Sequence, residues 1–69
     1  MGFKGYRQAI LDIAPGYDPR HVEAYMRLTF GTLDHLSPEE FRREVYLACR
    51  DIDEGGVDQA EGLARSYGM

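Results

Sequence analysis

The sequence has few of the residues that would commit it to a disulfide-bonded, metal-clustered or membrane-spanning protein. It contains one cysteine and no tryptophan among 69 residues, so no disulfide can form within the chain and no cysteine cluster can hold a metal. No apolar run approaches the ~18 residues that a membrane-spanning helix requires. The first residues lack the charged-then-apolar order of a secretory signal. We therefore expect a cytoplasmic protein with no membrane partner.

Strand patterning is also absent. No segment alternates apolar and polar residues, and no repeat or low-complexity linker interrupts the chain. Apolar residues recur instead at helical spacing, between residues that start and stop helices. The sequence predicts an all-α fold with a single small domain over residues 1–69, a compact bundle of three main helices plus a short N-terminal helix.

The clearest helix signal lies between Ser37 and Gly56. Ser37 and Glu40 form a potential capping box, and Pro38 suits the first helical position. Gly55 and Gly56 are expected to end the helix. One apolar stripe runs between these signals, and it consists of Phe41, Val45, Ala48, Cys49 and Ile52.

Three further helices are expected around this one. The first carries Phe3, Tyr6, Ile10 and Ile13 and ends at Pro15 and Gly16. The second is capped by Asp18, carries Val22, Tyr25, Met26, Thr29 and Phe30, and ends at Gly31. The last is capped by Asp58, carries Ala60, Leu63, Ala64 and Tyr67, and ends at Gly68. Within it, Gly62 suggests a close crossing with another helix. In the connector, Leu33 and Leu36 are expected to tuck beneath the helices.

Basic residues are scarce in the second half of the chain. The net charge is −4, and the whole excess falls in residues 35–69, where eight acids face four arginines. The run from Asp51 to Glu61 contains no base. Such a run is either a solvated helix end or a surface for a basic partner, and it disfavours direct nucleic-acid binding.

Two apolar residues leave the stripe of the main helix. Leu47 falls between Asp51 and Glu54, and Tyr46 falls beside Arg42. They are either covered by the N-terminal segment or form a second contact face. The candidate partner-binding residues are Tyr46, Leu47, Asp51, Asp53, Glu54, Asp58 and Glu61.

The candidates for chemistry have structural interpretations that we favour. Asp51–Gly62 matches an EF-hand loop at its first, third and sixth positions but lacks the bidentate Glu at the twelfth, so we expect no metal site. Asp34, His35 and Ser37 are neighbours, whereas a catalytic triad is assembled in space. Cys49 sits on the apolar stripe, where a thiol behaves as a small hydrophobe. We expect no enzyme and no cofactor.

The motif GTLDHLSPEEFRREV, the Gly-Gly turn and the terminal AEGLARSYGM resemble small uncharacterised proteins of bacterial phages and integrated mobile elements. The likeness covers residues 29–69 and carries no functional residues. It implies a bacterial cytosolic setting and the binding of a host complex, as anti-CRISPR and other anti-defence proteins do.

These observations favour a non-enzymatic protein–protein interaction module. The expected function is an inhibitor, of the anti-CRISPR or another anti-defence type, that binds a host protein complex at a basic, nucleic-acid-binding surface. Two alternatives remain: a self-assembling structural or adaptor subunit, for which a homodimer is possible, and a small helical DNA-binding regulator.

Overall fold

The computed structural model describes residues 3–69, with side chains from Gly5 onward. Its helices are α1 (Phe3–Ile13), α2 (Pro19–Phe30), α3 (Pro38–Asp51) and α4 (Val57–Ser66), and a π-helical turn, η1 (Ile52–Gly56), joins the last two. Residues 3–69 contain no strand, which confirms the predicted all-α fold. The predicted contribution of Phe3 to the apolar face of α1 concerns a side chain outside those described.

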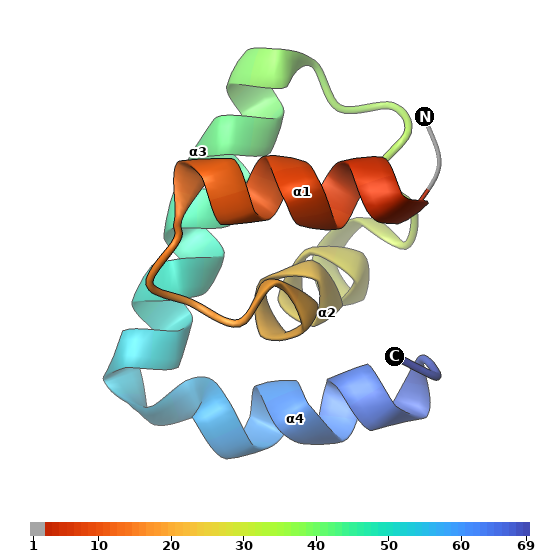
Figure 1. Ribbon diagram of the computed structural model, residues 1–69. Helices are drawn as coiled ribbons and strands as arrows, with labels where there is room; N and C mark the ends of the chain where they lie inside the picture. The colour runs from red at the N-terminus through yellow and green to blue at the C-terminus, as the bar shows by residue number, and fades with distance from the viewer. Residues whose placement is uncertain (1–2) are drawn as a thin grey trace.

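Helix α2 lies at the centre of the molecule. It packs against α1, α3 and α4, and α3 also contacts α1. Figure 1 shows α1 and α4 crossing the molecule on either side of α2, with α3 closing one side. Although the strongest helix signal in the sequence belongs to α3, the helix that the others share is α2.

The predicted helix starts at Asp18 and Ser37 are confirmed. Asp18 Oδ1 accepts a hydrogen bond from the backbone N–H of Arg20 at 2.9 Å. Ser37 Oγ accepts from the Glu40 N–H at 3.2 Å, while Glu40 Oε1 accepts from the Ser37 N–H at 3.1 Å. Both oxygens of the capping box therefore satisfy N–H groups that the first turn leaves free.

The core takes residues from all four helices and from the connector. The α3 stripe is buried as predicted, apart from Phe41, which is partly buried. The α2 stripe differs from the prediction, because Thr29 is exposed while Glu23 and Ala24 are fully buried. Leu33 is buried and Leu36 is partly buried, so the connector does tuck beneath the helices.

Helices α3 and α4 meet at a sharp corner without an intervening loop (Figure 1). Gly55 makes this corner possible with a φ of 105°, a conformation that costs glycine little. Helix α4 begins at Val57 after Gly56, so the prediction of an Asp58 cap was wrong and Asp58 lies inside the first turn. A carboxylate there still faces the positive end of the helix dipole.

The glycine that another part of the chain approaches closely is Gly56 and not Gly62. A Cβ at residue 56 would lie 2.8 Å from the backbone oxygen of Asp51 and closer still to the Tyr25 hydroxyl. That hydroxyl donates to the Gly56 carbonyl at 2.9 Å. A Cβ at Gly62 would meet nothing within 4 Å, so the predicted helix crossing there was wrong.

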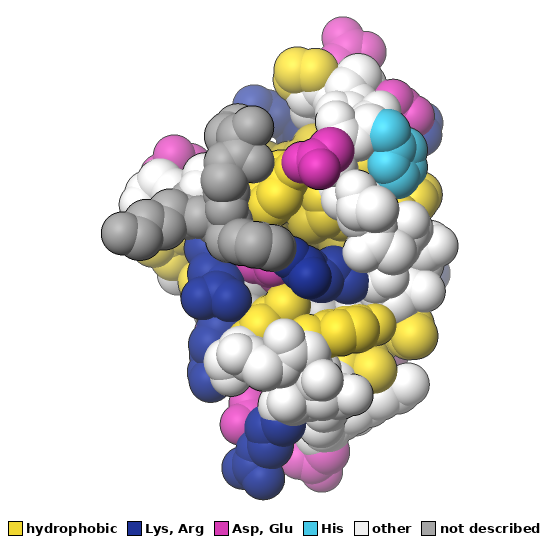
Figure 2. All heavy atoms as spheres, turned by 90° about the vertical axis from the view of Figure 1, so that its right-hand side faces the viewer, with side chains coloured by type: hydrophobic (Ala, Val, Ile, Leu, Met, Phe, Trp, Pro, Cys, Tyr) yellow, Lys and Arg dark blue, Asp and Glu magenta, His cyan; other side chains and the backbone are white. Residues whose placement is uncertain are grey.

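Glu23 carries a charge in the interior. Its side chain has no exposed surface, and two arginines face it. Arg7 Nε, from α1, donates to Glu23 Oε1 at 3.1 Å, and Arg27 Nε lies 3.0 Å from Oε2. Figure 2 shows basic side chains in a band across one face of the molecule, with hydrophobic side chains above and below. The pairing offsets the cost of removing a carboxylate from water.

Gly56→Ala should destabilise the fold, since the new methyl group must displace the Tyr25 hydroxyl and break its hydrogen bond. We expect a loss of about 1–3 kcal/mol in urea unfolding. The matched control is Gly62→Ala, which adds a methyl group in open space within a helix and should stabilise by up to ~1 kcal/mol. Equal effects of the two substitutions would contradict the close contact at Gly56.

Glu23→Ala should be destabilising, because it breaks the ion pairs with Arg7 and Arg27 and leaves a cavity where a fully buried side chain stood. The two arginines are partly exposed, so we expect a loss of about 2–3 kcal/mol, mainly from the cavity. The control Glu39→Ala removes an exposed carboxylate and should change the unfolding free energy by less than ~0.5 kcal/mol. Circular dichroism during urea titration measures both, and a folded Glu23→Ala of normal stability would refute the role of the pairing.

Candidate functional site

The outer face of α3 presents two large apolar side chains to solvent. Tyr46 is 54% exposed and Leu47 is 46% exposed. A shallow hollow of about 550 Å³ adjoins Tyr46, and its other lining residues are Pro38, Glu39, Arg42 and Arg43. A second hollow of about 370 Å³ adjoins Leu47, and it is lined by Thr29, Glu44, Arg50, Asp51 and Glu54. The two apolar side chains therefore stand among charged ones.

Carboxylates continue this face around the corner into α4. Asp51 ends α3, Asp53 and Glu54 lie in η1, and Asp58 lies in the first turn of α4. All four residues are exposed. Asp51 and Asp58 form no ion pair with any other described side chain. We call Tyr46, Leu47, Asp51, Asp53, Glu54 and Asp58 the corner surface.

Two carboxylates of the corner surface already have partners. Tyr17 donates its hydroxyl hydrogen bond to Asp53 Oδ2 at 2.6 Å. This bond to a carboxylate raises the pKa of Tyr17, because the neutral hydroxyl is the form that donates. Arg50 Nε donates to Glu54 Oε1 at 3.1 Å along one helix face. These contacts are exposed, so each contributes little to stability.

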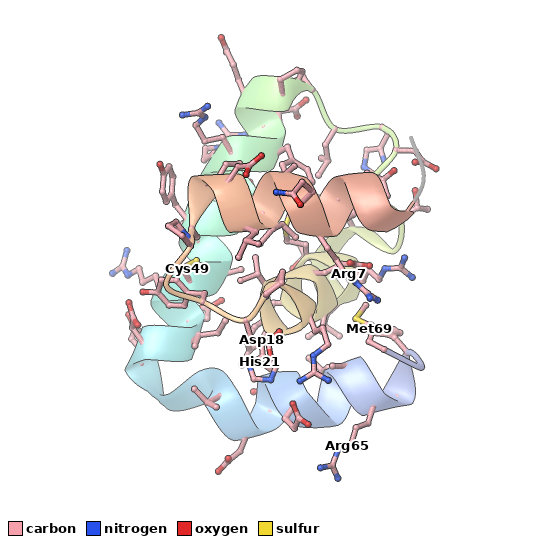
Figure 3. The ribbon with its side chains drawn as sticks, viewed as in Figure 1. Arg7, Asp18, His21, Cys49, Arg65 and Met69 are labelled. Atoms are coloured by element: carbon pink, nitrogen blue, oxygen red, sulfur yellow. The ribbon has the colours of Figure 1, made fainter. Side chains whose placement is uncertain are left out.

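Glu61, the remaining predicted partner-binding residue, ties α4 to α2. Its Oε2 lies 2.6 Å from His21 Nε2 and 3.6 Å from an Arg20 nitrogen, and its Oε1 lies 3.4 Å from Arg65 Nε. The hydrogen bond from His21, supported by the two arginines, lowers the pKa of Glu61. In Figure 3, His21 lies beside Asp18 at the end of α2 that approaches α4. Glu61 is therefore engaged within the fold, outside the corner surface.

The acidic run is thus less uniform in space than in sequence. No base occurs between residues 51 and 61, but the fold brings Arg50 to Glu54, and Arg20 and His21 to Glu61. Among the described side chains of this run, Asp51, Asp53 and Asp58 have no ion pair, and Asp53 accepts only a hydrogen bond from the neutral Tyr17 hydroxyl. A partner at this face would meet Tyr46 and Leu47 together with the exposed Arg43 and Arg50, and carboxylates at the corner.

A groove of about 410 Å³ lies between α1, the connector and the first turn of α3. Ala9, Ile13, Leu36 and Phe41 contribute its apolar lining. Its wall is stabilised by the stacking of Tyr6 on Phe41, whose ring centroids are 6.2 Å apart, and by a hydrogen bond from the Tyr6 hydroxyl to Asp34. Sequence patterns do not predict this groove, because it forms between segments far apart in the chain.

The residues considered for catalysis have structural contacts. Asp34 accepts from Tyr6, His35 packs its ring edge-on against Phe30 at 6.0 Å, and Ser37 caps α3. Cys49 is buried, and burial raises the pKa of its thiol, which keeps it in the less nucleophilic form. The loop considered for calcium is folded into η1 and the start of α4.

No family model, curated protein or solved structure matches this chain. None of the described helices is long and apolar enough to cross a membrane.

Glu61→Gln should lower the melting temperature at neutral pH, since it replaces the carboxylate that pairs with His21, Arg20 and Arg65. A carboxyl whose folded pKa is lowered stabilises the fold above its ordinary value of 4.5 and loses that contribution as the pH falls through the folded pKa. The difference between parent and variant should therefore shrink on acidification.

Thermal unfolding of the parent and of Glu61→Gln, followed from neutral to acid pH, measures the difference in melting temperature. The matched control is Glu54→Gln, which breaks the exposed pair with Arg50 and should change little at any pH. A parent–variant difference for Glu61→Gln that stays constant from neutral to acid pH would contradict the assigned pairing.

Proposed function

We propose that this chain is a non-enzymatic protein–protein interaction module that binds a basic surface of a larger protein through the corner surface. The observation that carries the proposal is the exposed position of Leu47 in a hollow that the carboxylates of Asp51 and Glu54 also line, followed along the chain by the exposed Asp53 and Asp58. Burying Leu47 against a partner supplies the hydrophobic gain, and the carboxylates supply orientation.

The charges of the corner surface suit a basic partner. Asp51 and Asp58 give up no ion pair with a described side chain when they bind a Lys or Arg side chain, and the Arg50–Glu54 pair is exposed and easily exchanged. Complementary charge accelerates the encounter of two proteins, and added salt weakens this effect. Because η1 joins α3 directly to α4, the carboxylates are held on helices and lose little freedom on binding.

A basic surface that binds nucleic acid is the kind of target that fits. Such surfaces carry Lys and Arg side chains placed to meet phosphates, and a row of carboxylates presents the same sign of charge to them. The chain would then act as an inhibitor that excludes nucleic acid from a host complex, in the bacterial cytosol. The resemblance of residues 29–69 to phage and mobile-element proteins supports an anti-CRISPR or other anti-defence role.

Reversing two of the unpaired carboxylates, Asp51→Lys with Asp58→Lys, should weaken target binding by about tenfold or more at low salt, since each change turns an attraction into a repulsion. Tagged parent protein is used to capture partners from a bacterial lysate, and the captured protein is identified by mass spectrometry. Affinity is then measured with the purified partner, in the presence and absence of a single-stranded oligonucleotide.

The matched control, Asp12→Lys with Gln8→Lys and Ser66→Lys, changes the net charge equally at exposed positions of α1 and α4 outside the corner surface and should retain binding. Circular dichroism verifies that both variants fold. The proposal fails if the corner variant binds the same partner as tightly as the control does. The inhibitor mechanism fails if the oligonucleotide does not displace the chain.

A further inference from the structure

The groove between α1, the connector and the first turn of α3 has the size and the lining of a small-molecule site. Its volume of about 410 Å³ lies within the ~300–1,000 Å³ that is usual for such sites. Figure 1 shows the connector passing above α1 on its way from the end of α2 to the start of α3. Tyr6 and Leu33 belong to the core and Phe41 packs against it, so the lining is already formed in the folded chain.

Two aromatic rings form the part of the lining that is held most firmly. The rings of Tyr6 and Phe41 stack with centroids 6.2 Å apart and planes inclined by 24°. The Tyr6 hydroxyl also donates a hydrogen bond to Asp34, which fixes the far end of its ring. An aromatic ring packs well against such a surface, so the apolar part of an occupant is best supplied by a ring.

Three charged side chains complete the lining, and they are Asp12, Asp34 and Arg42. None of them has an ion pair with another described side chain. Each carboxylate accepts one hydrogen bond at Oδ1, Asp12 from Gln8 at 3.0 Å and Asp34 from the Tyr6 hydroxyl. The Oδ2 atoms of both accept none from the described residues, so they can accept from a ligand.

We propose that this groove binds a small organic cation, a protonated primary amine joined to an aromatic ring. The ring packs against the apolar lining, and the ammonium group donates to Asp34 Oδ2. Asp34 is the better acceptor of the two carboxylates, because the Tyr6 hydroxyl holds it beside the aromatic rings, whereas the bond between Gln8 and Asp12 is exposed. Two carboxylates against one guanidinium give the lining a negative charge, which favours a cation over an anion.

Arg42 is the one lining residue that suits the opposite charge. It is exposed, and it also lines the hollow beside Tyr46, together with Glu39. Its guanidinium is therefore shared between two hollows. An anion in the groove would meet Arg42, but it would also meet the two carboxylates.

The groove shares no residue with the corner surface. Binding of the cation is therefore independent of the proposed function, and each can fail without the other.

Three probes of one shape and different charge test the proposal: 2-phenylethylamine, which is protonated at pH 7, the neutral 2-phenylethanol and the anionic 3-phenylpropionate. Each is titrated into the ¹⁵N-labelled full chain at low salt, and the amide shifts give the site and the Kd. The amine should shift amides of α1, the connector and the first turn of α3, with a Kd of about 1 mM for so small a ligand. It should bind about fivefold more tightly than the alcohol, and the anion more weakly than the alcohol.

Charge variants assign the contacts. Asp34→Asn removes the charge but keeps an oxygen that can accept from Tyr6, so it should weaken amine binding about fivefold and leave alcohol binding unchanged. Arg42→Gln should strengthen amine binding, because it removes a like charge. Ala9→Leu enlarges a lining side chain and should abolish the binding of all three probes. The control Asp58→Asn changes the net charge equally outside the groove and should leave every Kd unchanged.

Equal Kd values for the three probes overturn the assignment of a cation. Tighter binding of 3-phenylpropionate, lost in Arg42→Gln, overturns it in favour of an anion. Amide shifts confined to other parts of the chain, or no shifts at tens of millimolar amine, overturn the site itself. The amide spectrum of each variant reports its fold, and the order of the three probes on the parent chain decides the sign of the charge without any variant.

Discussion

Glu23 has no contact with solvent, so the two arginines beside it are a condition for the fold and not a surface detail. A carboxylate in the interior is tolerated only when a positive charge replaces the water that it loses. Arg27 comes from the same helix, but Arg7 comes from α1, and its reach determines where α1 can lie on α2. The stacking of Tyr6 on Phe41 then sets α1 against α3.

The other side of α2 depends on charge in a similar way. Glu61 meets His21 and Arg20 across the α2–α4 contact, and the buried residues of α4 are the small Ala60 and Ala64. Alanine lets two helices approach closely but supplies little apolar area. Ion pairs at the edge of the contact therefore help to define how α4 lies on α2. Each of the two outer helices is held to the central one by a carboxylate and its bases.

The sequence predicted what depends on neighbours along the chain. The Ser37–Glu40 capping box and the α3 stripe rest on residues three or four positions apart, and the structure has both. It did not predict the burial of Glu23. An acidic residue in the middle of a helix is usually exposed to solvent, and the sequence does not show that Arg7 of α1 lies beside it. The sequence predicts a close helix contact at Gly62 and not at Gly56 for a similar reason, because only the fold shows that the Tyr25 hydroxyl lies against Gly56.

The same distinction, between features set by sequence neighbours and features set by the fold, applies to the candidate site. The spacing on α3 indicated that Tyr46 and Leu47 leave the buried stripe, and both are exposed. The acidic run did not indicate that Glu61 is paired with basic side chains of α2, since His21 lies 40 residues away in sequence. The groove between α1 and α3 could not be predicted from the sequence either, because its walls come from three separate segments.

The α3–α4 corner is held from outside by two tyrosine hydroxyls, one from Tyr17 to Asp53 and one from Tyr25 to the Gly56 carbonyl. The chain has no tryptophan, so its ultraviolet emission comes from tyrosine alone. A phenol bound to a carboxylate emits less than one in water, because the carboxylate accepts its proton in the excited state. Tyr17 at the corner and Tyr6 beside Asp34 are both in this position, so a partner that breaks the Tyr17–Asp53 bond should raise the emission without any label, and a Tyr17→Phe variant should lack that change.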